Sequence, residues 1–230
     1  MISLSTKVAD IINIYPFIIN QLEYFEIYLP IGDYTIKNLA ERENINPEFL
    51  IFLFEYSVYD KISTDYIPQI KDLNFILTYL KNNHKYYSAN MFPHIDKLLQ
   101  KANYELNSDL KLVIKFFKEY YSEVIEHFDY ENNIVFPYIN FLLEKSENYN
   151  LSSNIHYSME EYKNHHDDIN EKLLDLKNLL IKYLPFTFDS VLRKKLLFNL
   201  YQLEKDLAIH SYIEDKILIP IVEMLENECK

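Results

Sequence analysis

Four long stretches of this 230-residue sequence repeat apolar residues at spacings of three and four, the pattern of a helix with one buried face. The stretches cover 73–98, 113–138, 155–180 and 196–224. Polar, turn-prone segments separate them at 103–108, 146–153 and 185–190, where Asn, Asp and Ser are suitable helix N-caps. Long amphipathic helices joined by short loops pack as antiparallel neighbours. The sequence therefore predicts an all-α fold with an up-down-up-down four-helix bundle.

The N-terminal part of the chain has a different organisation. Its apolar segments are shorter and are interrupted by prolines, so we expect a small helical domain over 1–66 in front of a bundle over 72–227. Residues 35–50 have the pattern of two short helices joined by a turn, as in a helix-turn-helix. That segment has only Lys37 and Arg42 as basic residues, against three glutamates, which argues against a DNA-binding regulator.

Composition excludes several classes of function. The chain has one glycine, so no segment can supply a glycine-rich phosphate loop. Its net charge of −12 opposes a nucleic-acid surface, because such surfaces neutralise phosphates. Cys229 is the single cysteine, which rules out an intramolecular disulfide and suits a reducing compartment. The first residues lack a basic leader with an uninterrupted apolar run, so we expect a cytoplasmic protein without a membrane segment.

Each of the four helical stretches has a histidine in the middle of its apolar face, and two have a glutamate one turn later. The six residues are His84, His127, Glu131, His166, His210 and Glu214. Buried ionisable groups cost several kcal/mol unless they are paired or bound to a metal. In an antiparallel hairpin two residues lie level when they are equally far from the turn. The midpoints between these residues fall near Asn107, Asn148 and Asp189, inside the three turn segments, so the six side chains are predicted to meet in one layer.

One motif occurs twice, at His127 and at His210: a histidine, a glutamate four residues later and a proline six residues after that. Residues four apart share a helix face, about 5 to 6 Å from each other. Such a pair can hold one metal ion, and the carboxylate can bridge to a second. Four imidazoles and two carboxylates without a thiolate suit two iron ions, with manganese or zinc as alternatives.

The three other histidines serve as a comparison. His165 lies on a charged helix face and is expected to be solvated. His156 and His94 each lie about 15 Å along the helix from the predicted ligand of their own stretch. Neither is assigned a role in the metal layer.

The two motifs and the residues around them, 126–139 and 202–220, resemble hemerythrin-like di-iron proteins. They are more closely similar to the repair-of-iron-centres family of iron-sulfur cluster repair proteins, over about residues 72–226. The resemblance implies two non-haem iron ions with carboxylate and oxo bridges. Residues 6–36 are similar to the small leading domain of that family. Family members often carry an adjacent cysteine pair where this chain has 29–31, Leu-Pro-Ile, so a thiol-dependent role does not carry over. His165 is a second departure, because relatives usually have a glutamate there.

The resemblance implies a role in the repair or protection of iron-sulfur clusters under oxidative or nitrosative stress, with iron-sulfur proteins as clients. The alternative is a module that binds or senses O₂ or NO at the same centre. A DNA-binding regulator acting through the N-terminal domain is a third reading, and a metal-free bundle with six polar residues paired among themselves is a fourth. No acid, base or nucleophile stands apart from the six ligands, so the sequence leaves enzymatic turnover open. It also leaves open whether the chain forms a homodimer.

Overall fold

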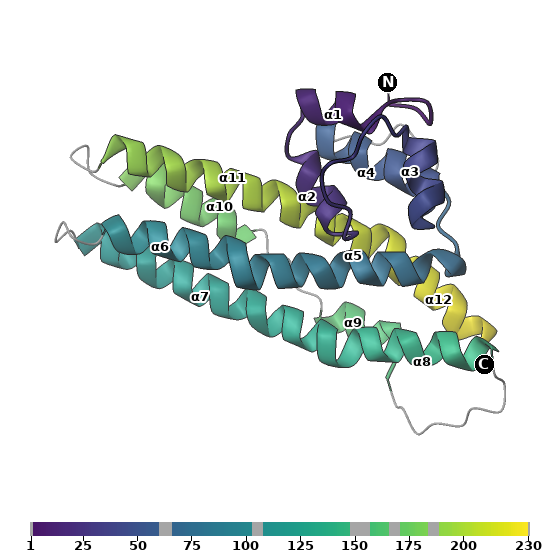
Figure 1. Cartoon of the computed structure of the whole chain (residues 1–230). Helices are drawn as coiled ribbons and strands as arrows, with labels where there is room; N and C mark the ends of the chain where they lie inside the picture. Colours follow the sequence, from purple (N-terminus) through teal and green to yellow (C-terminus); the bar gives the residue numbers. More distant parts are fainter. Residues whose placement is uncertain are drawn as a thin grey trace. The chain divides into compact units, whose positions relative to one another are not determined.

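The computed structural model describes residues 2–59, 66–102, 108–147, 157–165, 171–183 and 189–229. This part of the chain is helical and contains no β-strand (Figure 1). The α-helices are α1 Val8–Ile14, α2 Ile18–Glu23, α3 Ile36–Glu43, α4 Pro47–Tyr59, α5 Leu73–Tyr86, α6 Phe92–Ala102, α7 Ser108–Tyr130, α8 Phe136–Glu147, α9 Met159–His165, α10 Glu171–Asn178, α11 Ser190–Ile213 and α12 Ile219–Glu228. The predicted all-α fold, with long bundle helices after a smaller helical region, is confirmed.

The helices form two compact units. One consists of Met1–Asn83 with Ile209–Met224, and the other of His84–Ala208 with Leu225–Lys230. The domain boundaries proposed from the sequence, at residues 66 and 72, stay a prediction.

In the first unit, α3 and α4 are the two helices joined by a turn that the sequence pattern indicates. The Thr35 side chain accepts a hydrogen bond from the backbone N–H of Asn38 at 3.2 Å and caps the start of α3. Asn44, with φ of 53°, ends α3 in the left-handed conformation, which asparagine tolerates better than most residues. Phe49 and Phe52 of α4 are buried and form part of the core of this unit.

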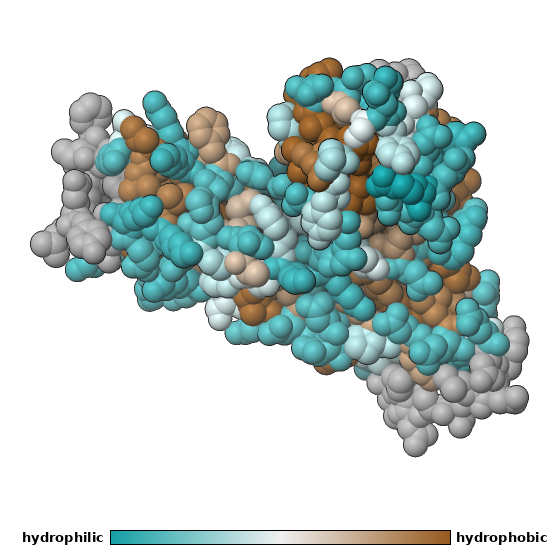
Figure 2. Space-filling model, in the orientation of Figure 1, coloured by the Kyte–Doolittle hydropathy of each residue, from teal (hydrophilic) through white to brown (hydrophobic). Residues whose placement is uncertain are grey.

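The surface of the first unit is mixed in polarity. Over α1 to α4, Figure 2 shows apolar residues at the surface between hydrophilic ones. Ile14, Tyr28 and Leu29 are among the exposed large apolar side chains there. Exposed apolar side chains are common on folded proteins, so they do not by themselves mark a binding surface.

The core of the second unit is built by α6, α7, α10 and α11. Phe92, Phe117, Leu176 and Leu200 are buried members of this apolar cluster, one from each of the four helices. Full burial of one such side chain stabilises the fold by about 1.5 to 3 kcal/mol. In Figure 1, α6 and α7 run side by side within this unit, as expected for consecutive antiparallel helices.

Two of the later helices begin with side-chain caps. The cap of α11 comes from the predicted turn segment 185–190, and the cap of α9 comes from outside the predicted turn segments. Oδ1 of Asp189 accepts hydrogen bonds from the backbone N–H groups of Val191 and Leu192, at 2.8 and 3.2 Å, and so caps α11. Ser158 and Glu161 bond each other's backbone N–H groups at the start of α9, the reciprocal arrangement of a capping box.

The long helices are interrupted by short π-helical segments. Three of these, Tyr87–Met91, Glu131–Val135 and Glu214–Leu218, each end two residues before a proline. A proline inside a regular α-helix has no N–H to donate, and its ring clashes with the carbonyl four residues earlier. A π-helical turn holds one residue more and relieves this conflict.

Among the described residues, no helix is both long enough and apolar enough to cross a membrane.

Candidate metal centre

One half of the site is built around Glu131, the first residue of its π-helical segment. Nε2 of His84, from α5, lies 3.2 Å from Oε2 of Glu131. Nε2 of His127, from α7, lies 3.2 Å from Oε1 of the same carboxylate. The side chains of Glu131 and His84 are 0% and 3% exposed, and that of His127 is 10% exposed. The two imidazoles therefore face opposite oxygens of one buried carboxylate.

The charge of Glu131 is set by two opposing effects. Burial raises the pKa of its carboxyl, because the charged form loses its hydration. Hydrogen bonds and electrostatic attraction from His127 and His84 outweigh this and hold the pKa well below its ordinary value of 4.5. Glu131 is therefore an ionised, buried carboxylate, which is the form that ligates metal ions.

Aromatic side chains hold the His84 imidazole in place. The rings of Phe128 and Phe136 stack on it, with centroids at 4.1 and 5.5 Å and interplanar angles of 15° and 16°. Stacked neighbours leave the imidazole little freedom to rotate and exclude water from its faces.

The other half of the site repeats the motif on α11. Nε2 of His210 lies 3.0 Å from Oε1 of Glu214, the first residue of the π-helical segment that follows. Both side chains are fully buried. The predicted pairing of a histidine with a glutamate four residues later is thus present in both motifs.

Asparagines fix which nitrogen of each imidazole faces its carboxylate. Oδ1 of Asn132 lies 3.2 Å from Nδ1 of His84, and Oδ1 of Asn83 lies 3.1 Å from Nδ1 of His210. An amide oxygen only accepts, so Nδ1 carries the hydrogen in both bonds. In the neutral imidazole, Nε2 then keeps its lone pair and is free to ligate a metal.

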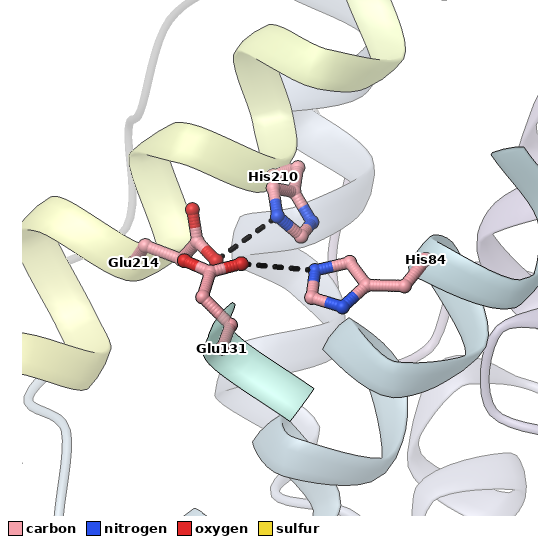
Figure 3. Close-up of side chains that lie close together, drawn as sticks. All are labelled: His84, Glu131, His210 and Glu214. Atoms are coloured by element: carbon pink, nitrogen blue, oxygen red, sulfur yellow. Dashed lines mark ion pairs between the residues drawn. The ribbon is translucent and has the colours of Figure 1, made fainter. Parts of the chain in front are cut away.

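His84, Glu131, His210 and Glu214 each offer one ligand atom, and these atoms all lie within 4.8 Å of one another. Figure 3 shows the four side chains pointing toward one another, with the His84–Glu131 and His210–Glu214 ion pairs drawn as dashed lines. Neutral imidazole nitrogens and carboxylate oxygens, without a thiolate, suit iron, manganese or zinc. The residues present therefore fit a metal ion.

The structure brings some, but not all, of the six predicted ligands together. Four form the cluster just described, and His127 contacts the carboxylate of one of its members. His166 lies outside the described residues, as does His156. The side chain of His165 is likewise not described, and His94 is exposed on α6, away from any metal layer.

Three contacts to the site were missed from the sequence: Asn83, Asn132 and Tyr162. The hydroxyl of Tyr162 donates to Oε1 of Glu131 at 2.5 Å. The position of Asn83 and Asn132 beside predicted ligands was a signal that could have been used, because buried imidazoles need a partner for their second nitrogen. Tyr162 resembles the other aromatic residues of its apolar helix face, so nothing in the pattern distinguishes it.

Comparison with known proteins identifies the family of the chain. The Hemerythrin family, described as the hemerythrin HHE cation binding domain, matches residues 76–222, which include both His-Glu motifs. Comparisons with curated proteins and with solved structures gave no match. The family match covers well over half of the chain, and its range includes the four residues of the cluster. The chain is a metal-binding helical protein that belongs to the hemerythrin HHE cation-binding domain family.

Proposed function

We propose that this protein is a non-haem di-iron protein that protects or repairs iron-sulfur clusters under oxidative or nitrosative stress. The observation that supports it is two buried His-Glu contacts, His84 with Glu131 and His210 with Glu214, each with Nε2 facing a carboxylate and Nδ1 held by an asparagine. Its partners would be iron-sulfur client proteins.

The proposed ligand set is the one the sequence indicates. His84, His127 and Glu131 would hold iron on one side, and His210 and Glu214 on the other, with His166 completing the set. The carboxylates of Glu131 and Glu214 are the candidates to bridge the ions. Iron held by such a set supplies a redox-active Lewis acid that takes up small ligands such as O₂ or NO.

The chain's own residues would prepare this site in three ways. The stacked rings of Phe128 and Phe136 keep water from His84. Asn83 and Asn132 present the imidazoles in the tautomer that can ligate. Burial keeps both carboxylates out of bulk water, which strengthens their attraction for a cation.

The test is a repair assay with the iron-loaded protein. An enzyme whose iron-sulfur cluster has been damaged by NO or peroxide is incubated with wild type, with His210→Ala, or with His94→Ala as an exposed histidine control. We expect reactivation by wild type and His94→Ala, and its loss in His210→Ala. Tight binding of NO by the iron-loaded wild type without any reactivation would refute the repair role and favour the binding or sensing module.

A further inference from the structure

The third helical stretch contacts Glu131 through a residue that is not one of the predicted ligands. Tyr162 of α9 is fully buried, and its hydroxyl donates a hydrogen bond of 2.5 Å to Oε1 of Glu131. A short O–H···O⁻ bond to an ionised acceptor is about twice as strong as a bond between neutral groups. The contact is therefore expected to restrain the carboxylate.

The orientation of that carboxylate matters because its two oxygens face different imidazoles. Oε1 lies 3.2 Å from Nε2 of His127, and Oε2 lies 3.2 Å from Nε2 of His84. Rotation about the last bond of the Glu131 side chain would take both oxygens away from their imidazoles. Two of the residues that contact this carboxylate, His84 and His127, are predicted ligands. The third, Tyr162, is not a predicted ligand.

The start of α9 is itself held firmly in place. Ser158 and Glu161 form its capping box, and the backbone N–H of Met159 donates to Oε1 of Glu226 at 2.8 Å. Tyr162 lies one turn further along, so its hydroxyl is presented from a fixed helix end rather than from a loop. Functional groups are held most precisely when they are supported in this way.

We infer that Tyr162 is a positioning residue, whose phenol hydrogen bond orients the Glu131 carboxylate for metal binding. The inference rests on the proposed function, because it concerns the same metal site. It assigns to α9 a contribution to the centre that does not depend on His166. It also predicts that removing the hydroxyl while keeping the ring is enough to weaken metal binding.

The matched variants are Tyr162→Phe and Tyr66→Phe. Tyr66 also donates its hydroxyl to a carboxylate, at 2.8 Å, but that carboxylate belongs to Asp72, which is outside the metal cluster. Both variants lose one phenol-to-carboxylate hydrogen bond and keep the ring. A general loss of packing would affect both, and a loss of carboxylate orientation would affect only Tyr162→Phe.

The experiment measures Co²⁺ affinity by competition with a chelator, the Co²⁺ absorption spectrum, and the thermal unfolding midpoint of the metal-free proteins. We expect Tyr162→Phe to bind Co²⁺ about 10-fold more weakly or worse, with a changed ligand-field spectrum. Tyr66→Phe should match wild type in both metal readouts, and the two variants should have similar unfolding midpoints.

Wild-type affinity and spectrum in Tyr162→Phe would overturn the inference while the proposed metal site still stood. A phenolate-to-iron charge-transfer band in the Fe³⁺-loaded wild type that is absent from Tyr162→Phe would also overturn it, because Tyr162 would then be a ligand. A wild type that binds no metal would overturn the proposed function and this inference together.

Discussion

Replacing Asn83 by leucine separates metal affinity from fold stability. Asn83 is fully buried, and its Oδ1 lies 3.1 Å from Nδ1 of the buried His210. Leucine has the same branched side-chain skeleton but is larger and offers no acceptor. The variant therefore removes the group that fixes the His210 tautomer and adds a packing cost at this buried position.

Two effects on stability nearly cancel in the metal-free protein. Removing the acceptor of Nδ1 costs about 1 to 3 kcal/mol, the usual penalty for a buried donor that loses its partner. Nδ2 of Asn83, however, has no hydrogen-bond partner among the described residues, so replacing the amide removes a penalty of the same size. The larger leucine side chain adds a packing cost of about 1 to 3 kcal/mol, so we expect the free energy of unfolding of the metal-free protein to fall by about that amount.

The effect of Asn83→Leu on metal affinity is not offset in this way. Losing the hydrogen-bond partner of a ligating histidine typically lowers metal affinity about 10- to 100-fold, which is about 1.4 to 2.7 kcal/mol. Asn83→Asp keeps an acceptor oxygen in the same place and should retain most of the affinity. Asn82→Leu is the control, because the neighbouring Asn82 amide donates to the backbone carbonyl of Tyr24 instead.

The assay combines a chelator competition titration with urea unfolding of the metal-free proteins. The reasoning predicts weak metal binding for Asn83→Leu alone, with a loss of stability no larger than this packing cost. Wild-type affinity in Asn83→Leu would refute the role assigned to the amide. A large loss of stability with no specific loss of affinity would show that Asn83 acts in packing.

Further predictions concern the helix cap and pH. Asp189→Ala should lower the free energy of unfolding by about 1 kcal/mol, because it removes the N-cap of α11, without changing metal content measured by elemental analysis. Since the folded-state pKa of Glu131 lies below its ordinary value, its carboxylate stabilises the metal-free fold above about pH 4.5, and this contribution is lost as the pH falls through the lowered pKa. Urea unfolding at several pH values should therefore show a smaller acid dependence in Glu131→Gln, and equal slopes would contradict the assignment. Bound metal should be released below about pH 6.5, where free imidazole protonates, and full metal retention at pH 4 in dialysed protein would contradict ligation by histidine.

The long helices and the paired motifs could be predicted from the sequence because both rest on spacing. Apolar residues at intervals of three and four define a helix face, and residues four apart lie on the same face. Histidines placed on an otherwise apolar face are also conspicuous, because buried ionisable groups need a partner. His210 and Glu214 could therefore be identified from their spacing alone, and the structure places them side by side.

The supporting contacts could not be predicted in the same way, since they depend on side-chain directions and not on spacing. Asn132 follows Glu131 in the sequence, yet its amide reaches His84 on a different helix. The π-helical segments change the direction of every residue that follows them. Their position two residues before Pro93, Pro137 and Pro220 shows that the prolines were a usable signal. The domain division proposed from prolines and segment length remains a prediction.

The central claim is that the buried histidines and glutamates hold iron, and the metal content of the protein purified without oxygen tests it most directly. Iron, manganese and zinc are measured per folded chain for wild type and for a Glu131→Ala, Glu214→Ala double variant. The account predicts about two iron ions per wild-type chain and a large loss in the variant, because two of the proposed ligands are gone. A folded wild-type protein that retains no metal after reconstitution with Fe²⁺, or a double variant that retains as much iron as wild type, would contradict it.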